Sequence, residues 1–124
     1  MTTRRILIVD DEEDIRTVAQ ASLEIMGDWE VITAASGQEG IAKAEADQPD
    51  VILLDVMMPD IDGPTTFQHL QANPATAHIP VILLTAKAQT ADQRKFAQLG
   101  VTAVFVKPFD PVTLSDQLVA ALDG

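Results

Sequence analysis

The chain contains no cysteine and no tyrosine, and its aromatic residues are one tryptophan and four phenylalanines. The absence of cysteine excludes disulfides and thiolate metal sites, and it is compatible with a reducing compartment. Long hydrophobic runs are also missing. The apolar run nearest the N-terminus, Ile6–Val9, has only four residues, which is too short for a secretory signal or a membrane span. We therefore expect a soluble, cytoplasmic protein with no membrane partner.

Positive charge is scarce. Eight lysines and arginines stand against 19 acidic residues, and the formal net charge is −11. Such a surface repels nucleic acid and anionic lipid, so we expect no direct binding of nucleic acid. Most acidic side chains simply solvate a surface, but carboxylates that converge on one place favour a divalent cation.

Length and apolar content predict one domain over residues 1–124. The chain has 124 residues, 47% of them hydrophobic, which is enough for a single core. Four short aliphatic runs each end in polar residues: Ile6–Val9 before Asp10-Asp11, Val51–Leu54 before Asp55, Val81–Leu84 before Thr85, and Ala103–Val106 before Lys107. With Trp29–Ala34, these runs predict five buried parallel strands.

Helical patterns separate the predicted strands. We expect helices over about 12–26, after Ser36, from Gly63-Pro64, from Thr90 to Gly100, and after Asp110-Pro111. Ser36 with Glu39 and Thr90 with Gln93 match capping boxes, Pro64 suits a first helical position, and Gly27 and Gly100 suit helix ends. In the first helix, Ile15, Val18, Leu23 and Met26 follow helical spacing, with Ser22 as the weak member of the stripe. The alternation predicts an α/β fold with a five-stranded parallel sheet and five helices on its two faces.

The polar residues at the strand ends predict a site. The carboxyl ends of parallel strands share one edge of an open sheet, so Asp10, Asp11 and Asp55 should meet Thr85 and Lys107 there. Three carboxylates repel one another without a counterion, and Mg²⁺, which binds through carboxylates and water, is the cofactor we expect. Asp11 taken alone would equally suit a helix cap.

These groups together predict chemistry on a phosphoryl group. Phosphoryl transfer asks a protein for positioning and for neutralisation of negative charge, which a cation, an ammonium and a hydroxyl supply. Asp55 is the expected nucleophile because it is central, and Asp10 and Asp11 are expected to hold the metal. Lys107 would bind a carboxylate at rest and a phosphoryl oxygen after transfer, and the Thr85 hydroxyl would follow the same oxygen.

The chain resembles the response-regulator receiver family over essentially its whole length. The motifs that carry the resemblance are ILIVDDE at 6–12, DVMMPDIDG at 55–63, LLTA at 83–86 and VFVKPF at 104–109. The resemblance implies a flavodoxin-like (βα)5 receiver fold with strand order 2-1-3-4-5. It also implies a two-component response regulator that takes a phosphoryl group from a sensor histidine kinase or a histidine phosphotransfer protein. Such a protein is no enzyme beyond its own phosphotransfer and slow self-dephosphorylation.

The resemblance also assigns roles to residues. Asp55 would be the phosphoacceptor, and Asp10, Asp11, Asp55 and the backbone carbonyl of Met57 would bind Mg²⁺. Thr85 and Phe105 would form a switch pair that changes the surface of residues 90–122 and so controls a downstream protein of unknown identity.

Other roles concern the shape and tuning of the site. Lys107-Pro108 would be a cis peptide bond, and Pro59 and Gly63 would shape the loop after the acceptor. Met57 and Lys87 occupy positions that tune dephosphorylation among receivers. The apolar Met57 cannot hold an attacking water, which predicts a slow loss of phosphate, and Lys87 would oppose this by drawing in water or a phosphatase.

Plainer interpretations remain open for single residues. Phe105 also suits a core strand, Pro108 an ordinary trans turn, and Gly63 a turn. His69 and His78 are expected on the surface and not in catalysis, because neither stands at a strand end.

Three other classes of protein share parts of this pattern. A flavodoxin-like FMN protein shares the fold, but the acids after the first strand would repel its phosphate. An aspartate-nucleophile phosphatase shares the chemistry but places its nucleophile after the first strand. A degenerate receiver would lack part of the acid set. Because no output domain follows the last helix, we expect a stand-alone regulator or a relay carrier, with an excised receiver of a longer protein left open.

Overall fold

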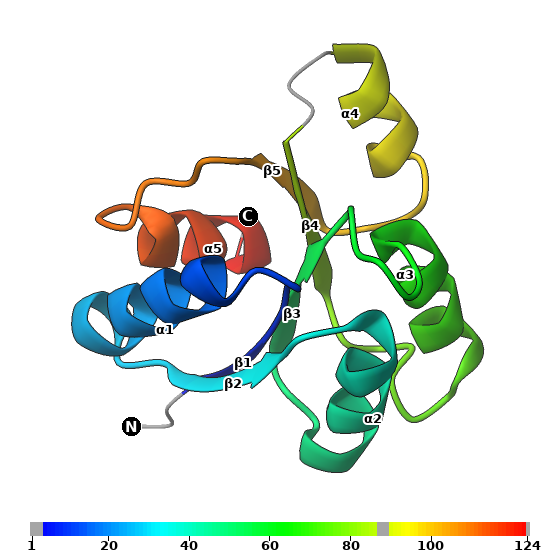
Figure 1. The fold of residues 1–124 in the computed structure, drawn as a ribbon, viewed down its shortest axis with the longest axis horizontal. Helices are drawn as coiled ribbons and strands as arrows, with labels where there is room; N and C mark the ends of the chain where they lie inside the picture. Colours follow the sequence, from blue (N-terminus) through cyan, green and yellow to red (C-terminus); the bar gives the residue numbers. More distant parts are fainter. Residues whose placement is uncertain (1–3, 87–89, 124) are drawn as a thin grey trace.

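The structure is a computed structural model, and it describes residues 4–86 and 90–123. Five parallel strands form one sheet in the order β2-β1-β3-β4-β5 (Figure 1). They are β1 (Arg5–Val9), β2 (Glu30–Ala34), β3 (Val51–Asp55), β4 (Val81–Thr85) and β5 (Ala103–Val106). The five predicted strands and their implied order are confirmed.

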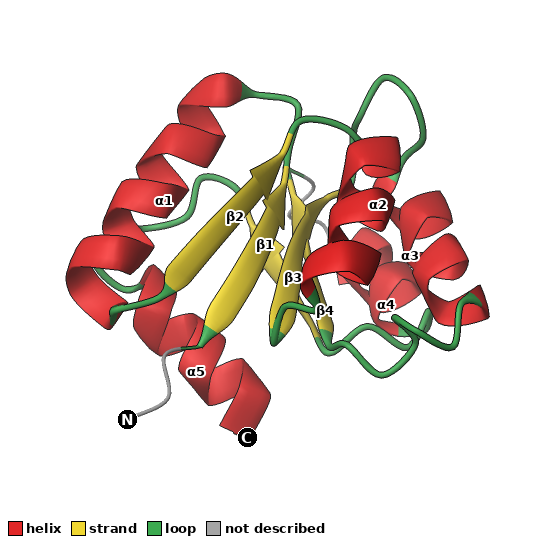
Figure 2. Ribbon diagram, turned by 90° about the horizontal axis from the view of Figure 1, so that it is seen from below, coloured by secondary structure: helices red, strands yellow, loops and turns green. Residues whose placement is uncertain are grey.

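Helices cover both faces of the sheet, as predicted. They are α1 (Glu13–Gly27), α2 (Gly37–Asp47), α3 (Gly63–Ala72), α4 (Thr90–Ala97) and α5 (Leu114–Asp123). The helices α1 and α5 lie on one side, and α2, α3 and α4 lie on the other (Figures 1 and 2). Among the described residues, no helix is both long enough and apolar enough to cross a bilayer.

The strands are apolar throughout because both of their faces are covered. One cluster packs between the sheet and the α2–α3–α4 layer, with Leu7, Ile52, Leu54 and Leu83 meeting Ala44, Phe67, Leu70 and Phe96. The other packs against α1 and α5, with Ile6, Ile8, Leu53 and Ile82 meeting Ala19, Leu23, Leu114 and Leu118. Alternate residues of β1, β3 and β4 therefore serve opposite layers, and the polar residues that end these strands are held on a rigid support.

The outer surface of α1 differs from the predicted apolar stripe. Val18 and Met26 are exposed, and so is Ile25, whose exposed fraction is 77%. The predicted members Ser22 and Leu23 are buried, and together with the small residue Ala19 they form the face of α1 against which α5 packs. The Ser22 hydroxyl donates a hydrogen bond to the carbonyl of Pro111, and the Trp29 indole donates one of 3.0 Å to Ser115 Oγ.

The contacts in the structure test two of the helix ends predicted in the N-terminal half of the chain. The capping box at α2 is confirmed: Ser36 Oγ accepts a hydrogen bond from the Glu39 amide at 3.1 Å. Helix α1 ends at Gly27, as predicted, but the left-handed position after the helix is taken by Asp28, with φ of 55°. Gly27 is small for another reason, because a Cβ there would overlap the side chains of Ser115 and Trp29.

The C-terminal helices begin and end at slightly different residues from those predicted. The described part of α4 is Thr90–Ala97; the predicted capping box of Thr90 with Gln93 stands beside residues 87–89, which lie outside the described residues, and stays a prediction. Gly100 closes the turn that follows, with φ of 98°, a value that suits glycine. Asp110 Oδ1 accepts a hydrogen bond from the Val112 amide at 2.9 Å, and this turn precedes α5.

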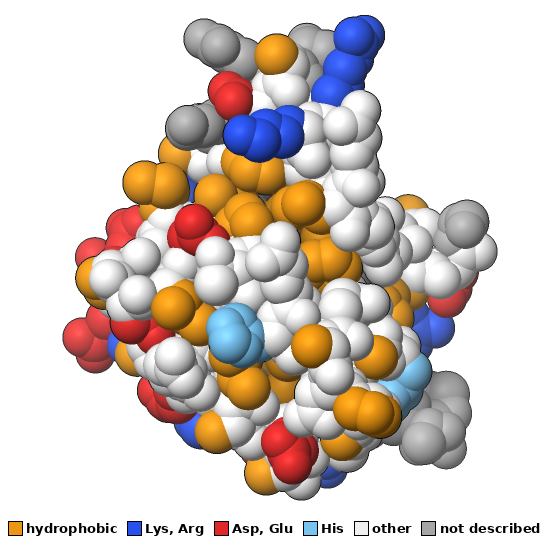
Figure 3. All heavy atoms as spheres, turned by 90° about the vertical axis from the view of Figure 1, so that its right-hand side faces the viewer, with side chains coloured by type: hydrophobic (Ala, Val, Ile, Leu, Met, Phe, Trp, Pro, Cys, Tyr) orange, Lys and Arg blue, Asp and Glu red, His pale blue; other side chains and the backbone are white. Residues whose placement is uncertain are grey.

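The surface over α2, α3 and α4 is mixed in character (Figure 3). Positive side chains stand at the α4 end of this face, where Arg94 and Lys95 are exposed. His69 on α3 and His78 in the following loop are both exposed, in agreement with the expectation that they are surface residues.

Candidate functional site

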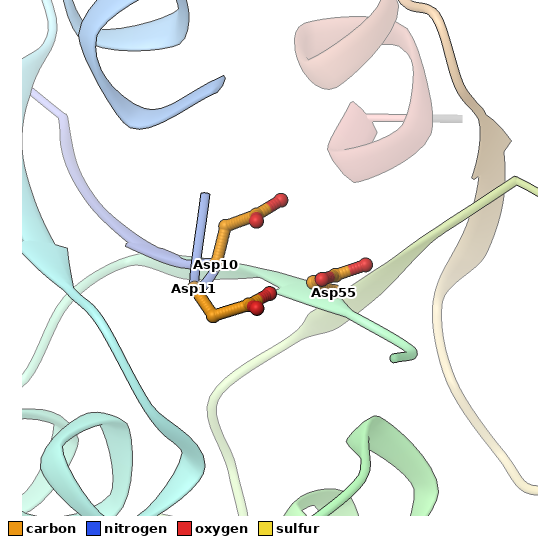
Figure 4. A group of neighbouring side chains, drawn as sticks. All are labelled: Asp10, Asp11 and Asp55. Carbon is orange, nitrogen blue, oxygen red and sulfur yellow. The ribbon is translucent and has the colours of Figure 1, made fainter. Parts of the chain in front are cut away.

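Three carboxylates gather at the carboxyl ends of β1 and β3 (Figure 4). Val9 of β1 pairs with Leu54 of β3, so the residues that follow them, Asp10 and Asp55, lie side by side at the edge of the sheet. Each of these two side chains, and that of Asp11, offers an oxygen, and the three oxygens lie within 4.8 Å of one another. The structure thus brings together the three acids that the sequence analysis singled out.

Lys107 completes this cluster from β5. Thr85 pairs with Val106, and the Lys107 amide donates a hydrogen bond of 2.7 Å to the Thr85 carbonyl, which holds the lysine at the end of β4. Its Nζ lies 3.1 Å from Asp10 Oδ2 and 3.2 Å from Asp55 Oδ1. The Lys107-Pro108 peptide bond is cis, as the resemblance implied.

The two inner carboxylates are buried and incompletely paired. The exposed fraction is 1% for Asp10 and 3% for Asp55. Among the described residues, the Oδ2 atoms of both lack a hydrogen-bond partner, although Asp10 Oδ2 is in ionic contact with Lys107. A buried polar atom without a partner is costly. An all-oxygen set with spare, buried lone pairs fits a hard cation, and exposed Asp11 offers its oxygen from the solvent side.

Burial and charge shift the ionisation of this cluster. Burial, and then the negative charge of Asp10, raise the pKa of Asp55 to about 6, against the opposing effects of Lys107 and of a hydrogen bond from the Met57 amide. Burial alone would lower the pKa of Lys107, but the close contacts with the negatively charged Asp10 and Asp55 outweigh it and raise that pKa. Lys107 is therefore a fixed cation, whereas Asp55 is strained in its ionised form.

The remaining predicted residues surround this cluster. Thr85 is buried at the end of β4, and Phe105 in β5 is half-buried and packs with the cluster under α1 and α5. The side chain of Met57 is 65% exposed, and Pro59 is exposed in the same loop. Lys87 lies outside the described residues. Their roles in switching and tuning stay predictions.

Gly63 contacts the backbone of Asp55 itself. Its amide donates a hydrogen bond of 2.8 Å to the Val56 carbonyl, and a Cβ at this position would lie 2.6 Å from the Asp55 carbonyl oxygen. The glycine is therefore required by close approach, and not by the freedom to turn.

We expect Gly63→Ala to displace Asp55 and to lower stability by about 1–3 kcal/mol, the usual cost of overpacking. Acceptance of a phosphoryl group at Asp55 should be impaired as well. The matched control is Gly100→Ala, which strains a left-handed backbone far from the site, where a Cβ would meet nothing within 4 Å. Denaturant unfolding and intact mass after treatment with a phosphodonor check both variants, and equal phosphorylation of the two would contradict the expectation.

Two contacts of the site were not foreseen from the sequence. Glu12 Oε1 lies 3.4 Å from Lys107 Nζ. The run of acidic residues at 10–12 is the sequence feature that could have indicated this contact. The Arg16 guanidinium donates a hydrogen bond of 2.7 Å to the Asp10 carbonyl. Arg16, the only positively charged residue of α1, therefore contacts the backbone of the site. No pattern in the sequence marks this second contact.

A model of the response regulator receiver domain matches residues 6–119. The chain belongs to this family. Members of the family act in two-component systems, where they interact with histidine kinases and with downstream effectors. This membership favours the receiver over the FMN-binding and phosphatase alternatives.

The receiver domain has curated relatives that are longer than itself. It is 40% identical over 119 residues to the alkaline phosphatase synthesis transcriptional regulatory protein PhoP of Bacillus subtilis, a match covering 96% of this chain and 48% of PhoP. It is 43% identical over 110 residues to the response regulator PleD of Caulobacter vibrioides, covering 89% of this chain and 24% of PleD. The chain thus spans about half, or less, of the length of these relatives.

Solved receiver structures superpose along the whole chain. The chemotaxis response regulator CheY4 of Vibrio cholerae is 33% identical with a TM-score of 0.89, and the match covers 97% of this chain and 99% of CheY4. A beryllofluoride-activated receiver domain of DrrB is 27% identical with a TM-score of 0.82, covering 99% and 100% of the two chains. The receiver fold is confirmed.

Proposed function

We propose that this receiver domain accepts a phosphoryl group on Asp55 in a Mg²⁺-dependent reaction. The observation that carries the proposal is the buried Asp55 carboxylate, which has one oxygen against Lys107 and the other without a hydrogen-bond partner among the described residues. The donor would be the phosphohistidine of a sensor kinase or of a histidine phosphotransfer protein, in keeping with the family.

Asp10, Asp11, Asp55 and the Met57 carbonyl are the groups we assign to the metal. The fit is supported by the three converging carboxylate oxygens and by the buried Oδ2 atom of Asp55, which has no hydrogen-bond partner among the described residues. Bound Mg²⁺ would neutralise negative charge on the transferring phosphoryl group.

The residues of this chain act by positioning and by charge. An Asp55 carboxylate oxygen forms the new bond to phosphorus while the bond from phosphorus to the donor nitrogen breaks, and the imidazole leaves with its electron pair. Lys107 holds Asp55 before transfer and pairs with a phosphoryl oxygen afterwards. Burial of Asp55 keeps bulk water away from the product.

Thr85 and Phe105 are the groups we assign to signalling. The added phosphoryl group carries about −1.5 to −2 charges, and the Thr85 hydroxyl would move toward it while the ring of Phe105 turns inward. Full conversion between two conformations needs about 5.5 kcal/mol of differential stabilisation. A single hydrogen bond contributes about 1 kcal/mol, so Lys107 and the metal must supply much of the difference.

The surface formed by α4, β5 and α5 is the proposed output, and its target is a protein of unknown identity. We propose a cytoplasmic location and a single domain over residues 1–124. Direct binding to nucleic acid is not part of the proposal, because the net charge of −11 opposes it.

Beryllofluoride, a stable mimic of a phosphoryl group, tests the proposal. Fluorine NMR of the protein with beryllofluoride should show bound signals only when Mg²⁺ is present, and Asp55→Asn should abolish them. Bound signals of equal intensity in Asp55→Asn, or none in the wild type, would refute Asp55 as the acceptor.

We expect Met57→Asn to lose phosphate faster than the wild type. The exposed, apolar Met57 side chain cannot orient an attacking water, whereas an amide can. The measurement is the decay of the phosphorylated form after removal of donor, with Met57→Leu as the control that stays apolar. A mutant decay equal to or slower than that of the wild type would rule out this explanation.

A further inference from the structure

The loop between β3 and α3, residues 56–62, is fastened to the first turn of α2. Asp60 Oδ1 accepts a hydrogen bond of 3.1 Å from the Gly37 amide, and Asp60 Oδ2 accepts one of 2.9 Å from the Gln38 amide. These are first-turn amides, which have no partner within their own helix. The carboxylate also lies at the positive end of the α2 dipole. The sequence analysis gave Asp60 no role.

Packing reinforces this contact. A Cβ on Gly37 would lie 2.5 Å from Ile61 Cγ1 and 2.5 Å from Thr66 Oγ1, so the α2 backbone sits directly on the loop and on α3. The Gln38 amide, and then the amides of Ile61 and Gly37, lower the pKa of Asp60 against the opposing effect of burial. The carboxylate is therefore held in its ionised, hydrogen-bonding form.

The same helix supports the other half of the metal site. Gly40 packs on β1, where a Cβ would lie 2.8 Å from Val9 Cγ2, and Val9 directly precedes Asp10. The first turns of α2 thus contact both segments that carry the carboxylates: the end of β1 and the loop after Asp55.

The base of the loop is closed independently of Asp60. The Gly63 amide donates to the Val56 carbonyl at 2.8 Å, and the Val56 amide donates to the Leu84 carbonyl at 3.1 Å. Between these ends lies Met57, two residues after Asp55 and three before Asp60. Loss of the Asp60 contact would leave these hydrogen bonds at the two ends of the loop intact. The middle of the loop would no longer be held against α2, so the orientation of Met57 would be less restricted.

We propose that Asp60 is a positioning residue, which couples the metal site of Asp10, Asp11, Asp55 and Met57 to the N-terminal turn of α2. The inference rests on the proposed function, because it assumes that this site binds Mg²⁺. Coupling is reciprocal: Asp60 raises the affinity for Mg²⁺, and Mg²⁺ in turn changes the environment of the Gly37 and Gln38 amides.

The test compares three variants of the full, unphosphorylated chain. Asp60→Ala removes the contact, and Asp60→Asn keeps a single accepting oxygen. Ser36→Ala is the matched control, because it removes a cap from the same helix at the Glu39 amide without touching the loop. Mg²⁺ affinity is measured by calorimetry, and NMR follows the amide signals of Gly37 and Gln38 during a Mg²⁺ titration.

Asp60→Ala should bind Mg²⁺ about tenfold more weakly, the lower end of the effect of removing groups that orient metal ligands. Asp60→Asn should lie between it and the wild type, and Ser36→Ala should bind as the wild type does. In the wild type, the Gly37 and Gln38 signals should shift with Mg²⁺, and Asp60→Ala should abolish the Gln38 response.

Three outcomes would overturn the inference. Equal Mg²⁺ affinity of Asp60→Ala and Ser36→Ala would overturn the coupling alone, and so would Gly37 and Gln38 signals that ignore Mg²⁺ in a wild type that binds it. A wild type that binds neither Mg²⁺ nor beryllofluoride would overturn the proposed function and this inference with it.

Discussion

Lys107→Ala should lower the free energy of unfolding by about 3–5 kcal/mol in metal-free buffer at neutral pH, the typical effect of removing one partner from a buried ion pair. Only 14% of the Lys107 side chain is exposed, and its Nζ is in contact with both Asp10 and Asp55. Without the ammonium, two buried carboxylates face each other with no counter-charge between them. Chemical denaturation in EDTA measures the loss.

Three comparisons make this prediction specific. Arg4→Ala removes an ion pair to Asp123 in which the arginine side chain is 42% exposed, and such pairs contribute about 0–1 kcal/mol. Mg²⁺ should restore much of the stability of Lys107→Ala by supplying the missing charge. In an Asp55→Asn background, the same lysine substitution should cost less. A loss for Lys107→Ala no larger than that for Arg4→Ala would contradict the account.

Asp55→Asn should become progressively more stable than the wild type as the pH rises from about 4 to about 6 in EDTA. The pKa of Asp55 is raised from 3.8 to about 6 in the folded protein, so the folded state holds this proton more tightly than the unfolded state does. Wild-type stability is therefore favoured at low pH and lost as Asp55 ionises. A shift of two units corresponds to about 3 kcal/mol.

The difference between the two proteins isolates Asp55 from other titrating groups. Denaturant unfolding of both, at a series of pH values in EDTA, should give a difference that rises over this window and levels off above it. Saturating Mg²⁺ should reduce the rise, because the metal stabilises the ionised carboxylate. If the difference in the free energy of unfolding between the two proteins stays constant from about pH 4 to about pH 6, burial does not raise the pKa of Asp55.

The strands and the residues of the site could be predicted from the sequence because both follow from the burial of the strands on their two faces. Strands buried on two faces are apolar throughout, so a polar residue such as Asp55 or Lys107 stands out where the strand emerges. Parallel pairing then carries these ends to one edge. The geometry at this edge, including the contact of Lys107 with both inner carboxylates, follows from that register.

Other features depend on tertiary contacts that local patterns do not record. Helical periodicity cannot tell which apolar residues of α1 will be covered, and α5 covers Ala19 and Leu23 while leaving Ile25 exposed. Gly27 looked like a helix stop, although its role is close packing against Ser115. The contact of Asp60 with α2 joins residues more than twenty positions apart, and no short motif marks it.

The most direct test of the account is the intact mass of the protein after incubation with Mg²⁺ and acetyl phosphate and rapid quenching. Asp55→Asn and an EDTA sample run beside the wild type. The account predicts one added phosphoryl group on the wild type with Mg²⁺, and none in either control. An adduct that persists in Asp55→Asn, or a wild type that gains no phosphoryl group and binds no beryllofluoride, would contradict it.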